Sequence, residues 1–268
     1  MIRGLRKLLA FLKRDFQSEV SYRVAFLLQV GGMLFSVAAF YFVAKMMNPK
    51  TEGLNGIEPF PWILVGLAFQ YYFSTALYSF SAKIRSEQML GTLEAMLVSP
   101  TPTSIVIFSE AAWDFAYGAI RVAIYLLFAT LVFGVKLHTT SLGTLAVGIF
   151  LTLLSSAGLG ILSASFILYF KRGDPINFFL SALTTFFGNV FFPSKLLPGS
   201  IQWVSGFLPI TWSLEVVRGA LLQGKGYADL RHDILNLAIL TVILLPLGLF
   251  FSRIAIRKAK KDGSLVQY

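Results

Sequence analysis

Residues Leu142–Phe170 read LGTLAVGIFLTLLSSAGLGILSASFILYF, a run of 29 residues without Asp, Glu, Lys or Arg. A helix needs about 20 mostly apolar residues to cross the hydrocarbon core of a bilayer. Because this run exceeds that length and carries no charge, it predicts a membrane-spanning helix. The basic pair Lys171-Arg172 follows it directly and marks its end.

The composition of the whole chain agrees with a membrane location. Of 268 residues, 56% are hydrophobic and 13% charged, and the mean hydropathy is +0.72. Ordinary globular domains are about 45–50% apolar and about 25% charged, so this chain is too apolar for a soluble or a disordered protein. The lack of Cys excludes a disulfide scaffold, a thiolate zinc site and a Cys nucleophile, and His138 and His232 leave little for a histidine metal site. We expect an integral membrane protein that binds no cofactor itself.

Six segments have the length and composition of membrane spans. They are residues 24–44, 59–82, 104–133, 142–170, 175–194 and 234–252. A seventh uncharged stretch, Leu196–Leu214, is interrupted by Pro198, Gly199, Gly206 and Pro209, and helix breakers at this density do not suit a lipid-facing helix. The expected fold is therefore all-α: one polytopic domain over residues 1–268, with six transmembrane helices and a re-entrant extracytoplasmic hairpin over 195–231 before the last span.

The distribution of Lys and Arg predicts the orientation of these spans. With six spans, the side of the two termini carries 15 of the 23 Lys and Arg, and the opposite side carries 7; the remaining Arg121 lies inside the third span. Because Lys and Arg concentrate on the cytoplasmic side, both termini are expected in the cytoplasm and the protein in the cytoplasmic (inner) membrane. This bias and attraction to anionic membrane lipid account for the net charge of +10 without nucleic acid. A cleaved signal peptide ending near Ser36-Val37-Ala38 is the weaker alternative, since the chain stays apolar through Ala44.

Two further segments have amphipathic patterns and lie on the predicted cytoplasmic side. Residues 1–21 place apolar residues at helical spacing among Arg and Lys, which predicts a helix lying in the membrane interface. Residues 83–103 begin with charges, carry Met89, Leu93, Met96 and Leu97 on one helical face, and stop at Pro100. The segment 1–21 could be a lipid anchor or a lever against a cytoplasmic partner. The segment 83–103 is longer than a simple connection between two spans requires.

The segment Gly219-Ala220-Leu221-Leu222-Gln223-Gly224-Lys225-Gly226 nearly matches the phosphate-binding P-loop pattern. Gly226 stands where that pattern requires a Ser or Thr hydroxyl for Mg²⁺, and the flanking strand and soluble helix are missing. The predicted topology also places the segment outside the cell. Energy from ATP would therefore have to come from another polypeptide.

Two groups of residues together resemble type-2 ABC exporter permeases. The segment from Glu87 to Pro102, centred on Gly91-Thr92-Leu93-Glu94, resembles the cytoplasmic coupling or gate helix of that family. The segments Phe191-Phe192-Pro193, Leu197-Pro198, Leu208-Pro209-Ile210-Thr211 and Glu215 to Arg218 resemble its signature between the fifth and sixth spans.

This resemblance implies a non-catalytic half-transporter that exports a substrate. Two permease copies, most simply a homodimer, would pair, and two cytoplasmic ATP-binding subunits that hold ATP and Mg would dock on them. The residues implied in ATPase coupling are Glu87, Gly91, Thr92, Leu93, Glu94, Lys171, Arg172 and Asp174. The residues implied in the extracytoplasmic hairpin are Pro193, Pro198, Pro209, Thr211 and Arg218.

Charged and small residues inside the spans give two further hypotheses. Glu110, Asp114 and Arg121 share one face of the third span, and charges at that depth should face protein or water; they form either a substrate path or gate, or an internal ion pair. Ser156, Gly160 and Ala164 repeat every four residues in the fourth span, a pattern typical of close helix packing within one chain.

Two other classes of protein compete with the exporter permease. An ion-coupled secondary transporter would require inverted repeats and intramembrane ion sites, and the two halves of this chain show no convincing repeat. An integral membrane enzyme would require a cluster of His, Asp or Glu, whereas the two His are far apart in sequence. The sequence does not identify the substrate.

Overall fold

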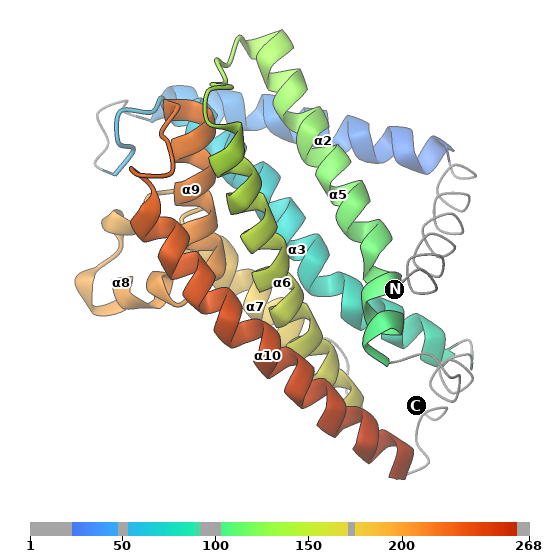
Figure 1. Cartoon of the computed structure of the whole chain (residues 1–268). Helices are drawn as coiled ribbons and strands as arrows, with labels where there is room; N and C mark the ends of the chain where they lie inside the picture. Colours follow the sequence, from blue (N-terminus) through green and yellow to red (C-terminus); the bar gives the residue numbers. More distant parts are fainter. Residues whose placement is uncertain (1–22, 48–52, 90, 92–102, 171–174, 262–268) are drawn as a thin grey trace.

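The computed structural model describes residues 23–47, 53–89, 91, 103–170 and 175–261. Every regular element in these ranges is a helix, as the all-α prediction requires (Figure 1). The elements are α2 (Arg23–Met46), α3 (Pro59–Met89), α5 (Thr103–Phe133), α6 (Leu142–Phe170), α7 (Pro175–Phe187), η1 (Ser194–Leu196), α8 (Gly199–Gly206), α9 (Pro209–Gln223) and α10 (Arg231–Lys261). The expected interfacial helix over residues 1–21 lies outside the described residues.

Five helices among the described residues are long and apolar enough to cross a membrane. The candidate spans are Leu27–Met46, Pro59–Ala82, Trp113–Phe133, Leu142–Phe170 and Arg231–Ala259. Each overlaps one of the six segments predicted from hydropathy. The protein is therefore a multi-pass membrane protein, and the difference in count comes from the predicted fifth span.

That predicted span, residues 175–194, is only partly helical. Helix α7 has 13 residues and ends at Phe187, so it is about 20 Å long against a hydrocarbon core of about 30 Å. Gly188 follows, and Asn189 adopts a left-handed conformation with φ of 62°, which stops the helix. Hydropathy did not predict this ending because Gly and Asn leave the stretch uncharged.

The helices pack around two central helices: α6 packs against α3, α9 and α10, and α3 also packs against α2 and α5. The start of α3 and the ends of α5 and α9 gather at one end of the bundle, and the last turns of α3 and α10 lie at the other (Figure 1). Helix α2 lies at the edge of the bundle and is strongly tilted relative to α10. The core therefore lies around α3 and α6, whereas α2 remains largely exposed on its outer side.

Glycines allow α6 to approach two neighbours closely. A Cβ added at Gly160 would lie 2.7 Å from the Ala76 carbonyl oxygen of α3, and one added at Gly158 would lie 2.8 Å from the backbone of Leu244 in α10. Gly248 of α10 faces the same crossing, because its Cβ would lie 2.5 Å from the Gly158 carbonyl oxygen. The buried small residues of α6 thus pack within the chain, as the sequence pattern predicts.

Helices α8 and α9 occupy the region where helix breakers led us to expect a hairpin. Pro198 precedes α8 as its N-cap, and Pro209 occupies the first turn of α9, where a missing N–H costs nothing. Helix α9 ends at Gly224, which adopts the left-handed conformation with φ of 65°. The prolines and glycines thus delimit two short helices between α7 and α10.

Candidate functional site

The side chain of Arg218 is the most completely buried charge described, with 2% of its surface exposed. It projects from α9 toward the start of α3 and the segment that follows α7. Its guanidinium donates two hydrogen bonds to the Trp62 carbonyl oxygen, at 2.9 and 3.2 Å. Two further bonds reach the carbonyl oxygens of Asn189 at 2.7 Å and Val190 at 3.1 Å. One cation therefore joins three segments that are far apart in sequence.

The surroundings of Arg218 hold these acceptors in place. Its guanidinium carbon lies 3.4 Å from the centre of the Trp62 indole ring, within cation–π distance. Asn189 donates from its side chain to Glu215 Oε1 at 2.6 Å and accepts from the Ser194 amide at 3.1 Å. The carboxylate of Glu215 precedes Arg218 by three residues on α9, so it lies near the buried positive charge. We call these side chains the Arg218 centre.

The Arg218 centre requires a residue without a side chain at position 66. A Cβ added at Gly66 would lie 2.3 Å from the Val190 carbonyl oxygen and 2.6 Å from Arg218 Nη2. Both atoms belong to the hydrogen-bonding arrangement around the guanidinium. Gly66 thus allows the backbone of α3 to approach the segment after α7.

Polar contacts continue from the Arg218 centre along the boundary between α3 and α7. Gln70 of α3 donates to the hydroxyl of Thr185 at 2.8 Å. One end of α7 carries Asn177, which donates to the Ser81 hydroxyl of α3 at 2.6 Å and accepts from Ser163 of α6. Gln70 and Ser81 of α3 thus pair directly with Thr185 and Asn177 of α7, and Trp62 is linked to Asn189 through Arg218. We call these residues the α3–α7 polar seam.

The seam joins helices that are otherwise apolar. Hydrogen bonds between membrane helices stabilise packing modestly, by about 0.6 kcal/mol on average, and fix which residues face each other. The described residues contain no group of three or more His, Asp or Glu that could hold a metal ion. The chemistry that this arrangement supports is therefore the positioning of helices.

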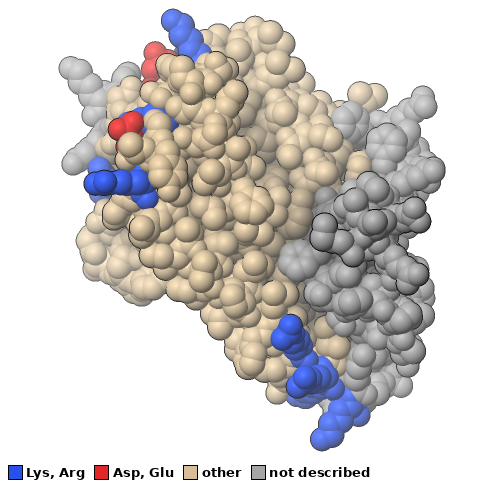
Figure 2. All heavy atoms as spheres, in the orientation of Figure 1, with Lys and Arg blue, Asp and Glu red and all other residues tan. Residues whose placement is uncertain are grey.

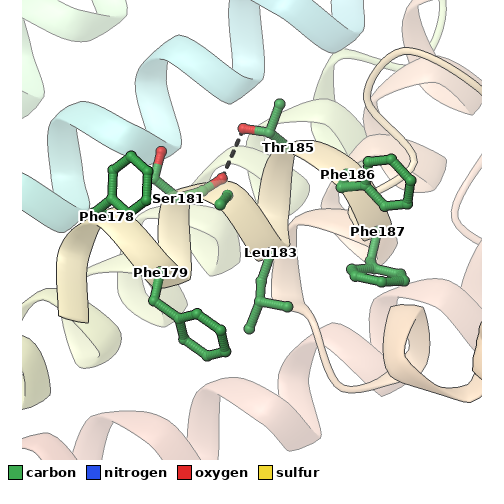
Figure 3. A pocket seen from close by; sticks show the side chains of 8 residues that line it. Phe178, Phe179, Ser181, Leu183, Thr185, Phe186 and Phe187 are labelled. Carbon is green, nitrogen blue, oxygen red and sulfur yellow. Dashed lines mark hydrogen bonds between the residues drawn. The ribbon is translucent and has the colours of Figure 1, made fainter. Parts of the chain in front are cut away.

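The opposite face of α7 is exposed and aromatic. Phe178, Phe179 and Phe186 have 74%, 60% and 55% of their surface exposed. A shallow groove is lined entirely by residues of α7, from these phenylalanines round to Ser181 and Thr185 (Figure 3). Thr185 donates to the Ser181 carbonyl oxygen at 2.7 Å, so its hydroxyl is satisfied within the helix. Helix α7 is thus polar toward α3 and apolar outward.

Of the three charges predicted in the third span, the structure places Arg121 most clearly. Its side chain is 7% exposed, and its guanidinium carbon lies 4.3 Å from the Tyr117 ring centre and 5.2 Å from that of Tyr71. Asp114 is half-buried on α5, and Glu110 belongs to the same helix. Arg121 therefore faces protein, and both the gate and the ion-pair hypotheses stay predictions.

Most of the predicted coupling residues lie outside the described residues. These are Thr92, Leu93, Glu94, Lys171, Arg172 and Asp174. Glu87 belongs to the last turns of α3, and Gly91 adopts a left-handed conformation with φ of 69°. The structure thus differs from the single helix expected over residues 83–103, because residues 83–89 continue α3 and the left-handed turn at Gly91 interrupts the helix. The coupling role stays a prediction.

The residues predicted in the extracytoplasmic hairpin differ in how deeply they are buried. Pro193 is buried, and a Cβ added at Gly53 would lie 2.5 Å from its Cβ. Pro209 and Thr211 are buried in α9, whereas Pro198 is exposed. The structure brings Arg218 together with Asn189 and Trp62, which sequence reasoning did not select. Their only signals were an Asn within a predicted span and an aromatic residue near the start of another.

The near-P-loop segment forms a helix end. The Lys225 amide donates to the Gly219 carbonyl oxygen at 3.0 Å, and the Gly226 amide donates to Asp229 Oδ2 at 3.2 Å. Gly224, directly before them, carries the left-handed turn that ends α9. Both amides are thus occupied by local hydrogen bonds, and the absence of phosphate binding stays a prediction.

Positive charge gathers at one end of α10 (Figure 2). Arg253, Arg257, Lys258 and Lys261 are all exposed there. Lys258 Nζ lies 3.6 Å from the ring centre of Tyr169 in α6. This end of the bundle also holds the last turns of α3 (Figure 1).

The long apolar helices identify the chain as a multi-pass membrane protein. Buried polar contacts fix how these helices pack against one another. The sequence model of the ABC-2 type transporter family matches residues 6–222, a range that includes α2 through α9. The chain therefore belongs to the ABC-2 type transporter family and is a permease subunit of a type-2 ABC transporter, as its motifs indicated. Members of this family are membrane transport components that work with an ATP-binding subunit. No curated protein matches the sequence significantly.

Proposed function

We propose that the chain exports a substrate across the cytoplasmic membrane, driven by ATP that a separate cytoplasmic subunit hydrolyses. The family match over residues 6–222 carries this proposal. ATP and Mg would be bound by the partner subunit, and this chain would supply the path and the coupling segments. The exposed Lys and Arg at the end of α10 support a cytoplasmic position for that end, because cytoplasmic ends of spans carry most Lys and Arg.

In the proposed topology the chain crosses the membrane six times, with both termini in the cytoplasm. Helix α7 alone is too short for a full crossing, so the segment after Phe187 would complete it. Helices α8 and α9 would then form a re-entrant hairpin on the extracytoplasmic side. Non-helical backbone at membrane depth must be covered by protein or water, and the bonds from Arg218 to Asn189 and Val190 provide part of that cover.

The functional unit in this proposal is a homodimer. The outward face of α7 is the proposed seam between the two copies, because its phenylalanines are exposed. A second copy that presents the same face would cover them. The substrate path would then lie near α7 of each copy.

The α3–α7 polar seam gives this proposal a mechanical route. The proposed coupling segment, residues 87–97, starts in the last turn of α3, so force from a docked ATPase would act first on that helix. Gln70 and the carbonyl of Trp62 connect α3 to α7 and to the Arg218 centre. Movement of α3 would therefore be transmitted to α7 and the hairpin through directional contacts.

The experiment that tests the proposal is reconstitution with the ATP-binding subunit. We expect a soluble P-loop ATPase to co-purify with this chain, and we expect Leu93→Asp and Glu94→Ala to lower transport or to uncouple it from ATP hydrolysis. Truncating one partner of a buried charge pair at an interface costs about 2–5 kcal/mol. Glu58→Ala is the matched control, since Glu58 is exposed before α3 at the opposite end. Wild-type transport and ATPase rates in both coupling variants would contradict the proposed docking segment.

A further inference from the structure

A second cavity lies at the basic end of the bundle, between α6, α7 and α10. It encloses about 460 Å³ and is lined mainly by Leu162, Phe166, Tyr169 and Phe170 of α6, with Phe251 and Ile254 of α10. Cavities of about 300–1,000 Å³ hold small ligands in proteins. Phe170 and Phe251 are 53% and 47% exposed, so the cavity opens sideways at the surface of the bundle. We call it the α6–α10 groove.

The polar side chains in the wall of the groove are already satisfied by protein. Ser163 donates to Asn177 of the polar seam, and Ser165 donates to the Ile161 carbonyl oxygen at 2.6 Å. The wall thus offers a ligand apolar contact and few free polar groups. Ser163 and Asn177 also join α6 to α7 at the inner wall of the groove, where the groove meets the polar seam. The groove therefore suits a hydrocarbon chain that enters from the side.

One end of the groove is positively charged. Phe251, Ile254 and Lys258 follow each other at intervals of three and four residues, so they lie on one face of α10. Lys258 Nζ lies 3.6 Å from the Tyr169 ring centre, and Tyr169 lines the groove. Lys261 follows one turn later, and residues 253–261 contain no Asp or Glu. A ligand in the groove would thus meet apolar side chains along its length and cations at its end.

We propose that the α6–α10 groove binds one anionic glycerophospholipid of the cytoplasmic leaflet. An acyl chain would occupy the apolar groove, and the phosphate would lie beside Lys258 and Lys261. The assignment to that leaflet rests on the proposed orientation, in which the end of α10 is cytoplasmic. Anionic lipids give that leaflet its negative potential, and each nearby Lys or Arg strengthens their attraction by about fivefold.

In this proposal the lipid stays bound to the protein during transport. The groove does not serve as an entry site for the transported substrate. The Ser163–Asn177–Ser81 contacts close its inner side, and a Cβ at Gly160 of the same helix would lie 2.7 Å from the Phe80 ring. A lipid here would fill the space between α6 and α10 and would bind whether or not the ATP-binding subunit is present.

Native mass spectrometry of the purified full-length chain tests the proposal. The chain is incubated with equal amounts of phosphatidylglycerol and phosphatidylcholine that carry the same acyl chains. We expect the wild type to retain phosphatidylglycerol at least tenfold more than phosphatidylcholine. The Lys258→Gln/Lys261→Gln variant should lose this preference, because both exposed cations are removed while the apolar wall of the groove is unchanged. Ala255→Trp, which fills the groove, should lower retention of both lipids.

A variant with the same charge loss elsewhere provides the control. Lys136→Gln/Lys195→Gln removes two exposed cations from outside the α10 end, and it should keep the wild-type preference. The proposal would be overturned if the wild type retained the two lipids equally. It would also be overturned if Lys258→Gln/Lys261→Gln kept the preference for phosphatidylglycerol, or if the control variant lost that preference to the same extent. Release of the lipid during ATP-driven transport would make it cargo and would likewise overturn the proposal. The binding measurement needs no ATPase, so its failure is distinct from failure of the proposed export function.

Discussion

The guanidinium carbon of Arg218 lies 3.4 Å from the centre of the Trp62 ring, and the same guanidinium donates two hydrogen bonds to the carbonyl oxygen of Trp62. Trp62 is thus both a π surface and an acceptor for one buried cation. Burial of an unpaired charge is very costly, and these contacts with those to Asn189 and Val190 compensate that cost. The pair fixes the distance between the start of α3 and α9.

Replacing Arg218 is therefore expected to destabilise the protein strongly. Arg218→Met leaves three buried carbonyl oxygens without their donor, and Arg218→Lys cannot restore the forked geometry. We expect a loss of about 3–5 kcal/mol for breaking such a buried network, measured as a lower apparent melting temperature in detergent. Arg231→Lys, at an exposed position, should leave the melting temperature unchanged. A stable Arg218→Lys variant would show that a positive charge is sufficient for stability without the forked geometry of the guanidinium.

The crossing of α6 and α10 depends on glycine. Gly248→Leu would place its Cβ 2.5 Å from the Gly158 carbonyl oxygen, so the two helices would have to separate. We expect a loss of about 1–3 kcal/mol, the usual cost of overpacking, and reduced yield of folded protein. Gly31→Leu in α2 is the control, because nothing lies within 4 Å of a Cβ at that position. Equal melting temperatures for the two variants would refute the close crossing.

The α3–α7 polar seam is expected to matter more for coupling than for stability. Gln70→Leu and Asn177→Leu each remove contacts worth about 0.6 kcal/mol apiece, so folding should persist. We expect less substrate transported per ATP hydrolysed, measured in the reconstituted transporter, since α7 would no longer follow α3. Asn236→Leu, which removes only a contact with His232 on α10, should keep the wild-type ratio. If the seam variants also keep it, coupling follows another route.

The proposed topology is open to labelling because the native sequence contains no cysteine. Ser200→Cys in α8 and Arg257→Cys in α10 both place the thiol at exposed positions. An impermeant maleimide added to intact cells should modify the first and spare the second, and permeabilised cells should allow both. The reverse pattern would place the basic end of α10 outside and invert the proposed orientation.

Hydropathy was sufficient to predict most of the fold. The segments 59–82 and 142–170 coincide with candidate spans of the structure, and 104–133 nearly coincides with α5 (Thr103–Phe133). Helix α10 extends beyond the predicted 234–252 to Lys261, because a helix can continue past the apolar run into basic residues. The end of α7 at Phe187 was not predictable from hydropathy, since Gly188 and Asn189 are uncharged.

The candidate site was only partly predictable. The signature between the fifth and sixth predicted spans included Arg218, but its partners Trp62 and Asn189 lie 156 and 29 residues away in sequence. A single sequence does not contain that pairing. Arg121 was selected because it is charged within a span, and the structure added the rings of Tyr71 and Tyr117 beside it.

The sequence by itself determined that this chain lies in a membrane, that it is helical, and where its longest helices run. The physical reason is local: an uncharged run such as Leu142–Phe170 is unstable in water, and in lipid its backbone can satisfy its hydrogen bonds within a helix. Only the tertiary structure decided which polar groups meet. Arg218, Trp62 and Asn189 become one site because burial forces each polar group to find a partner, and the packing of α3, α7 and α9 selects which partners are within reach.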